Sequence, residues 1–246
     1  MPTNTPVSLF IPCLVDACFP EVGDAMVRVF DRLGIPLVYP EGQTCCGQPA
    51  FHSGYWREAA TVARRFIDLF EDEMAIVCPS GSCVAMIRHH YPELFQDDPE
   101  MLARAVAIAG KTFEFTEYLV DVLGVTAVGA IFPAKVTYHD SCHLARTLGI
   151  REQPRQLLRH VRDLHLVEMA SADTCCGFGG TFSVNYPDIS LALVDDKIDN
   201  ILKSGADTVV GCDASCLMNI RGRMSRRKEQ VRVLHIAQVL ASAGGA

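Results

Sequence analysis

The tripeptide Cys45-Cys46-Gly47 returns later in the chain as Cys175-Cys176-Gly177. Each copy has one cysteine far upstream and another far downstream. The upstream gaps are 32 and 33 positions, and the downstream gaps are 37 and 40 positions. Four cysteines that recur in the same order at nearly equal spacing indicate a duplicated motif. Its eight members are Cys13, Cys45, Cys46 and Cys83 in the first copy and Cys142, Cys175, Cys176 and Cys216 in the second.

The composition is that of a soluble globular protein, with 49% hydrophobic and 21% charged residues in 246 positions. A chain of this length forms one large domain or two smaller ones. The net charge of −7 argues against general nucleic-acid binding. The aromatic residues do not alternate with basic runs, so no stacking platform for single strands is expected.

The cysteines are best interpreted from the expected compartment. Residues Met1 to Pro6 carry no positive charge and precede no long apolar core, so no secretory signal is expected. The longest apolar stretch, residues 119–132, contains Asp121 and is too short to span a bilayer. We therefore expect a cytoplasmic protein without a transmembrane segment. In that reducing compartment, 11 cysteines indicate metal binding or redox work rather than disulfides.

Short β-rich apolar runs alternate with amphipathic runs of helical period along the chain. This alternation predicts parallel sheets with helices packed over them. The repeat predicts two pseudo-equivalent Rossmann-like halves, residues 1–132 and 133–246, joined by an apolar connector at 125–134. Strands are expected at 7–11, 35–39, 74–77, 135–139, 164–169, 208–210 and 231–235, and helices at 21–33, 55–70, 112–123, 153–161 and 188–203.

Four of the repeated cysteines lie just beyond predicted strands: Cys13, Cys83, Cys142 and Cys216. In parallel α/β folds, ligands gather at the carboxyl ends of the strands. We therefore expect one metal site per half at these strand ends. The two halves either share a sheet edge or face each other.

Thiolates are soft ligands, and four of them suit zinc or an iron–sulfur cluster. Consecutive side chains diverge, so a vicinal pair suits a cluster with spread ligand positions better than one small ion. The glycine after each pair allows positive φ and leaves room for a cluster. Structural zinc usually takes C-x₂₋₄-C knuckles, which only Cys78/Cys83 and Cys212/Cys216 approximate. We expect two iron–sulfur clusters, with zinc as a substitute and dithiol redox work or buried, metal-free thiols as open alternatives.

The duplicated pattern resembles the cysteine-rich domain named after its CCG signature. That domain is found in the cysteine-rich subunit of heterodisulfide reductase and in the iron–sulfur subunits of glycolate and glycerol-3-phosphate dehydrogenases. Residues 45–50, 138–146 and 175–183 resemble the lactate utilization protein A family most closely. This resemblance implies an iron–sulfur electron-transfer subunit of a multi-subunit L-lactate dehydrogenase that oxidises lactate to pyruvate. The implied partners are other subunits of that complex and an electron-acceptor protein or, indirectly, quinone.

The ends of the motifs depart from the related proteins. Heterodisulfide reductases end each motif with Cys-x-x-Cys, which supplies five ligands for a non-cubane cluster, whereas four cysteines suit a conventional 4Fe–4S cluster. Here Cys78 and Cys212 are possible extra ligands, but Cys78 aligns with Gly211 and Cys212 with Pro79. Because they do not align with each other, they are weaker candidates. Cys18 has no counterpart and is expected to be a small buried hydrophobe.

Two histidines and one basic cluster each have two possible roles. His139 and His143 flank Cys142 and either donate hydrogen bonds to cluster sulfurs or serve local packing. The basic cluster at 221–228 either docks an acidic partner or forms a solvated helix face. No catalytic residue is assigned. Without a flavin or nicotinamide motif, the chain is expected to be a redox subunit rather than a complete enzyme; the alternatives are a cluster that acts directly on substrate and a zinc-binding assembly protein.

Overall fold

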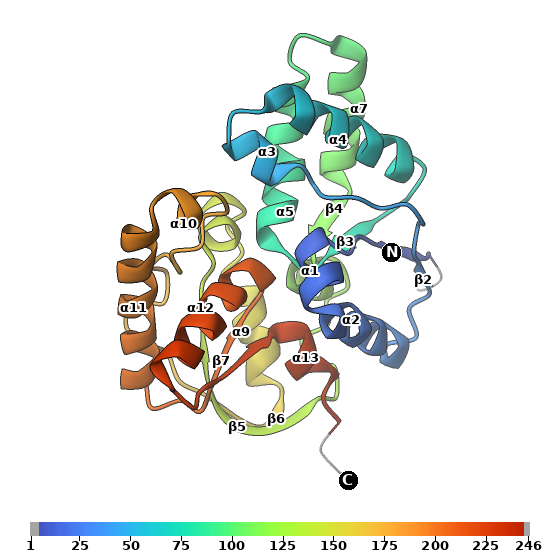
Figure 1. The fold of residues 1–246 in the computed structure, drawn as a ribbon. Helices are drawn as coiled ribbons and strands as arrows, with labels where there is room; N and C mark the ends of the chain where they lie inside the picture. The colour runs from blue at the N-terminus through green and yellow to red at the C-terminus, as the bar shows by residue number, and fades with distance from the viewer. Residues whose placement is uncertain (1–4, 244–246) are drawn as a thin grey trace.

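The computed structural model describes residues 5–243 and has two four-stranded sheets with helices packed around them (Figure 1). Residues 1–4, which belong to the segment predicted to lack a secretory signal, lie outside the described residues. Among the helices of residues 5–243, none is long and apolar enough to cross a membrane.

Both sheets are entirely parallel and have the same strand order. This confirms the prediction of two Rossmann-like halves. The sheets are separate, so the halves do not share a sheet edge. The first has the order β2-β1-β3-β4, with β1 Val7–Leu9, β2 Leu37–Val38, β3 Ile76–Cys78 and β4 Thr112–Glu114. The second has the order β6-β5-β7-β8, with β5 Ile131–Tyr138, β6 Arg162–Leu166, β7 Thr208–Gly211 and β8 Arg232–His235.

The helices connect the strands in the same sequence in each half. Their apolar faces point inward, as in α4, where buried residues recur at helical spacing from Ala59 to Phe70. The first half contains α1 Cys13–Cys18, α2 Pro20–Arg32, α3 Gln48–His52, α4 Trp56–Phe70, α5 Gly81–Ala85, η1 Met86–His90, α6 Tyr91–Leu94, α7 Pro99–Gly110, α8 Phe115–Glu117 and η2 Tyr118–Val122. The second contains η3 His143–Thr147, α9 Glu152–Arg159, α10 Phe182–Asn185, α11 Pro187–Lys203, α12 Ala214–Arg227 and α13 Ile236–Ala241.

One predicted helix begins differently in the structure. Residues 112–114 were expected to be helical, but they form β4, which pairs with β3. The buried Glu114 carboxylate then accepts hydrogen bonds from Thr116 N and Glu117 N and so caps α8. The expected connector at 125–134 also ends early, because β5 begins at Ile131. The division of the chain at residues 132 and 133 stays a prediction.

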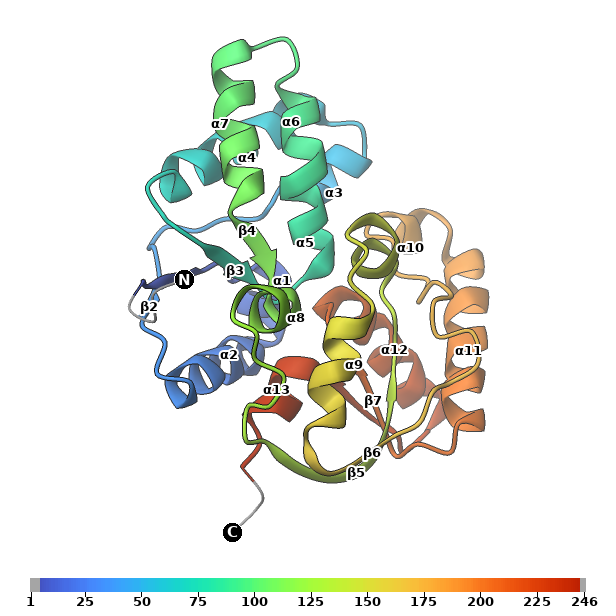
Figure 2. The same cartoon turned by 180° about the vertical axis from the view of Figure 1, so that it is seen from behind.

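A central core joins the halves, because each half ends in a helix that packs on the other half. Helix α13 packs on α2, while α8 and η2 pack on α9 (Figure 2). Arg32 at the end of α2 donates hydrogen bonds to Val128 O, Leu240 O and Ala241 O at 2.8–3.0 Å. The buried residues of this core come from both sheets and from these helices.

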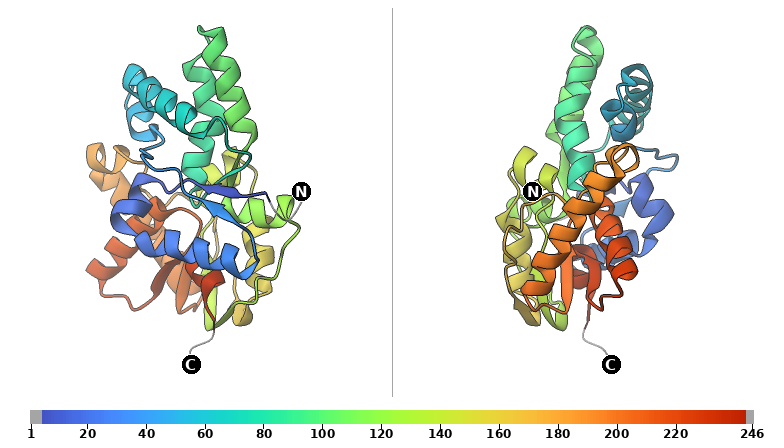
Figure 3. Two further views of the ribbon diagram at one scale, coloured as in Figure 1. Left: turned by 90° about the vertical axis from the view of Figure 1, so that its right-hand side faces the viewer. Right: turned by 60° about the vertical axis from the view of Figure 1, so that its left-hand side comes forward.

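The outer face of each sheet has its own core. In the first half, Phe10 and Ile76 pack against α4, with the Phe10 and Phe66 rings 4.8 Å apart. In the second, Val209 packs with residues of α11 and α12. The first half alone carries a helical extension, α6 and α7, which projects beyond its sheet (Figure 3).

Candidate metal centres

The order of the strands places four cysteines at two equivalent crevices. In the first sheet, β2 lies on one side of β1 and β3 on the other, so the connections leave β1 in opposite directions. Such a reversal opens a crevice at the carboxyl ends of the strands. Cys13 begins α1 after β1, and Cys83 is the third residue of α5 after β3. Cys142 and Cys216 occupy the same places after β5 and β7.

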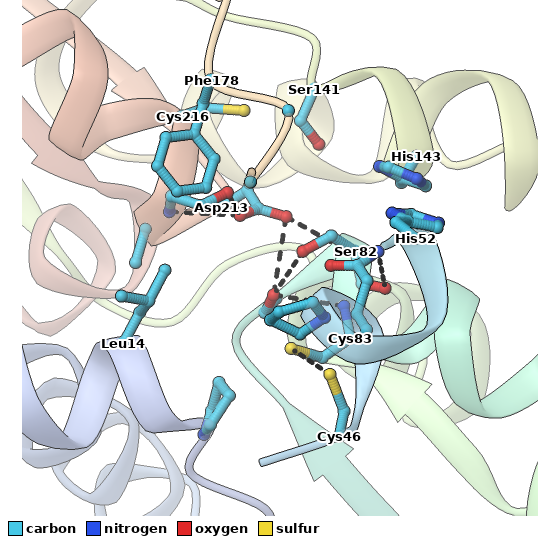
Figure 4. A pocket seen from close by; sticks show the side chains of 18 of the residues that line it. Leu14, Cys46, His52, Ser82, Cys83, Ser141, His143, Phe178, Asp213 and Cys216 are labelled. Carbon is cyan, nitrogen blue, oxygen red and sulfur yellow. Dashed lines mark hydrogen bonds between the residues drawn. The ribbon is translucent and has the colours of Figure 1, made fainter. Parts of the chain in front are cut away.

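The first group of thiols consists of Cys13, Cys45, Cys46 and Cys83. The Cys13 and Cys45 sulfurs are 3.6 Å apart, and the Cys46 and Cys83 sulfurs are 3.3 Å apart. Figure 4 shows the latter two sulfurs facing each other. The loop between β2 and α3 therefore brings the vicinal pair to the ends of β1 and β3, and each member contacts a different partner.

The second group has the same arrangement. Cys175 interacts with Cys142, and Cys176 interacts with Cys216. His139 joins this group, because one ring nitrogen and the sulfurs of Cys176 and Cys216 all lie within 4.8 Å of one another. Thus all eight repeated cysteines gather into two groups of four, each built within one half.

The backbone conformation after each vicinal pair of cysteines requires glycine. Gly47 has φ +86° and Gly177 has φ +81°, in the left-handed region that favours glycine. This turn directs the Gly47 N–H at Cys45 Sγ at 3.4 Å, and the Gly177 N–H at Cys175 Sγ at 3.3 Å. The turn therefore supplies a donor to the first sulfur of each pair.

These hydrogen bonds favour a thiolate at one position in each half. Donation from Cys13 and Cys46, with the Gly47 N–H, lowers the pKa of Cys45. Donation from Cys142 and Cys176 lowers the pKa of Cys175 in the same way. The thiolate is the form that binds metal, so each group has one position that favours ligation, while the same hydrogen bonds raise the pKa of Cys13 and Cys142.

Three anchoring residues escaped the sequence interpretation. The Tyr91 hydroxyl donates to Cys46 O at 3.0 Å, and Asn219 Nδ2 donates to Cys176 O at 2.8 Å. The buried Lys197 holds the loop before the second pair through Ser171 O and Ala172 O. All three lie on helices, and only their side-chain types could have suggested a structural role.

The two possible extra ligands lie in different places. Cys78 is buried on the outer face of the first sheet and interacts with Cys83. Cys212 belongs to the central core, where its sulfur is 3.2 Å from the Tyr138 hydroxyl. Cys78 pairs with Glu114 just as Gly211 pairs with His235, so Cys212 is shifted by one residue relative to Cys78. Successive residues of an extended chain point to opposite faces, which separates the two thiols.

Cys18 was predicted to be buried, and this is wrong. It ends α1 and is exposed, because only Val15 of that helix is buried. The basic cluster at 221–228 is largely engaged within the chain. Arg223 and Arg227 form ion pairs with Asp195, and the Arg221 guanidinium lies 4.4 Å from the centroid of the Phe19 ring.

Both thiol groups line one cavity of about 430 Å³. Between them lies Asp213, which is buried and caps α12; its carboxylate also accepts a hydrogen bond from Ser82 N at 2.9 Å. His143 lines the cavity and stacks on His52, with ring centroids 5.8 Å apart (Figure 4). His143 Nδ1 is also 3.6 Å from Cys142 Sγ. The cavity therefore joins two thiol groups from different halves.

The donor set of the first group fits a metal centre bound by thiolates. Its four sulfurs form two close pairs, and within residues 5–243 no three of them lie within 4.8 Å of one another. Iron–sulfur clusters and zinc both take four thiolate ligands, so the residues present fit such a centre.

Comparison with known proteins identifies the same cysteine-rich pattern. The family model described as "Cysteine-rich domain" (CCG) matches residues 7–88 and 136–221. Lactate utilization protein A from Exiguobacterium sp. is 54% identical over 236 residues, which cover 95% of this chain and 96% of that protein. The protein of the same name from Bacillus subtilis is 49% identical and is covered over 99% of its length.

Among solved structures, a hypothetical protein from Helicobacter pylori matches with a TM-score of 0.70 and 9% identity. The match covers 100% of this chain and 52% of that one, so the chain spans about half of that protein and shares its fold. The full-length similarity and the duplicated domain confirm the resemblance. The chain belongs to the lactate utilization protein A family.

Proposed function

We propose that this chain is the iron–sulfur electron-transfer subunit of a multi-subunit complex that oxidises L-lactate to pyruvate. The names of its relatives point to lactate utilization. The observation that carries the redox role is the gathering of eight cysteines into two groups of four around one cavity. The groups' proposed ligands are Cys13, Cys45, Cys46, Cys83, Cys142, Cys175, Cys176 and Cys216.

Bound iron–sulfur clusters would supply one-electron transfer. The chain's own residues hold the thiolates, with Gly47 and Gly177 donating to the first sulfur of each pair. Because both groups line the same cavity, electrons would cross a short distance between the halves. The 11 thiols are free, as is expected of a protein that works in a reducing cytoplasm.

Oxidation of lactate itself is assigned to a partner subunit, because the sequence has no flavin or nicotinamide motif. The cavity favours a second candidate function, direct action on a substrate, since Leu14 and Phe178 give it apolar walls beside the sulfurs. Adding L-lactate separates the two. On the electron-transfer proposal, lactate leaves the spectrum of the isolated chain unchanged and bleaches it once the partner subunits are present. Bleaching by lactate alone would favour direct action.

The cofactor is tested by anaerobic purification, followed by visible and electron paramagnetic resonance spectra and by iron and sulfide analysis. We expect a coloured protein with iron and sulfide in both halves. A colourless protein with stoichiometric zinc and no iron, even after cluster reconstitution, would refute the redox proposal and favour a zinc-binding assembly protein.

Single substitutions test whether each half holds its own cluster. We expect Cys46→Ser and Cys176→Ser each to remove the iron of one half and to leave the other half loaded. Cys18→Ser is the matched control, because this exposed thiol lies outside both groups, and it should retain all the iron. If either cysteine variant of the two groups empties both halves, the groups form one shared site instead.

A further inference from the structure

The surroundings of the two thiol groups differ at two pairs of equivalent positions. Phe10 follows β1, and His139 follows β5 at the equivalent place; Ser8 pairs with Ile76 of β3 as Thr137 pairs with Val209 of β7. On the neighbouring strand, Cys78 of the first half corresponds to Gly211 of the second. The first half therefore has phenylalanine with cysteine where the second has histidine with glycine.

The two differences concern neighbouring space, because the histidine ring lies next to where the cysteine side chain would extend. In the first half, Phe10 fills an apolar core and Cys78 places its sulfur beside Cys83. In the second half, a Cβ built on Gly211 would lie 3.8 Å from His139 Cδ2. The imidazole of His139 thus lies next to the space into which a cysteine at position 211 would extend. At this point the second half has a ring with nitrogen donors where the first half has a thiol.

The His139 ring has no other role in the described structure. Its side chain is buried, with 1% of the residue exposed, and neither ring nitrogen has a hydrogen-bond partner among residues 5–243. Buried polar groups in native proteins are normally paired, so an unpaired imidazole indicates a missing partner. One ring nitrogen already lies within 4.8 Å of the sulfurs of Cys176 and Cys216.

We propose that His139 is a nitrogen ligand of the second metal centre, bound alongside Cys176 and Cys216. The inference rests on the proposed function only in requiring that a metal centre forms. Neutral imidazole binds iron as well as zinc. Replacing thiolate with imidazole at an iron–sulfur cluster raises its reduction potential. With Cys78 as the corresponding additional ligand of the first centre, beside Cys83, the second centre has imidazole where the first has thiolate. The second centre should therefore have the higher reduction potential, so that an electron passes from the first half to the second.

Pulsed electron paramagnetic resonance of protein labelled with ¹⁵N-histidine tests this ligation. Cys45→Ser with Cys46→Ser provides a background in which only the second centre is loaded, and the spectra are taken in its paramagnetic oxidation state. We expect the strong coupling of a nitrogen bonded directly to iron. It should disappear in His139→Phe and persist in His143→Asn, the control for the other histidine beside this thiol group.

A second substitution, Gly211→Cys, distinguishes loss of the histidine ligand from loss of the fold. Phenylalanine is the residue of the equivalent position in the first half, and His139→Phe is expected to lower the iron content of the second half. Adding Gly211→Cys should restore the iron through a new thiolate and should shift the potential in the negative direction. Full iron and an unchanged spectrum in His139→Phe would overturn the inference alone, whereas a wild-type protein without iron would overturn the proposed function as well.

Discussion

The glycines of the two vicinal-cysteine motifs should differ in how they tolerate alanine. Both have positive φ, so alanine costs about 1–2 kcal/mol at either position. A Cβ on Gly47 would lie 3.4 Å from Ala59 O, which is ordinary contact, but on Gly177 it would lie 2.4 Å from Ser190 O. That backbone carbonyl belongs to α11 and cannot move alone, which adds about 1–3 kcal/mol of overpacking.

Thermal melting of the metal-free, reduced variants measures this difference. For a chain of this size, each kcal/mol lowers Tm by about 2–4 °C. We therefore expect Gly177→Ala to melt at least about 2 °C below Gly47→Ala, since the overlap contributes at least about 1 kcal/mol. The displaced loop also carries Cys175 and Cys176, so Gly177→Ala should retain less iron in the second half than Gly47→Ala retains in the first.

Gly180→Ala is the matched control in the same loop. It has φ +63° but no atom within 4 Å of the added Cβ, so it tests backbone strain without overlap. Gly180→Ala should melt close to Gly47→Ala. If Gly177→Ala melts at the same temperature as Gly180→Ala, the close approach to Ser190 O does not contribute and the reasoning is refuted.

Three further predictions concern buried ionisable groups. Burial raises the pKa of Glu114 to about 7, so the folded state retains a proton and stability falls as pH rises toward that value; Glu114→Gln should abolish this fall in Tm. Burial lowers the pKa of His235 to about 4, so stability falls as pH drops from the ordinary histidine value toward 4, and His235→Asn should flatten this side; persistence of either slope would contradict the assignment. Arg155→Met leaves the Asp140 carboxylate buried without its ion pair and should cost about 3–5 kcal/mol, which Asp140→Asn should largely restore in denaturant titrations. A single variant as stable as the wild type would count against this ion pair.

Much of the architecture could be predicted because it depends on local patterns. The spacing of the hydrophobic residues along the chain indicates the alternation of strands and helices. The recurrence of Cys-Cys-Gly indicates the duplication directly. The ends of the strands then indicated where Cys13, Cys83, Cys142 and Cys216 gather. The segment at 112–114 was misjudged because its pairing with β3 is a long-range contact that residue type does not reveal.

The sequence by itself determined two α/β halves with one thiol group each, since spacing along the chain sets which loops reach the strand ends. Only the tertiary structure decided that both groups line one cavity, because that depends on α13 packing on α2 and α8 packing on α9. The tertiary structure also decided where the side chains of Cys78 and Cys212 lie. A shift of one residue turns a side chain to the opposite face, so one thiol lies beside Cys83 and the other beside Tyr138.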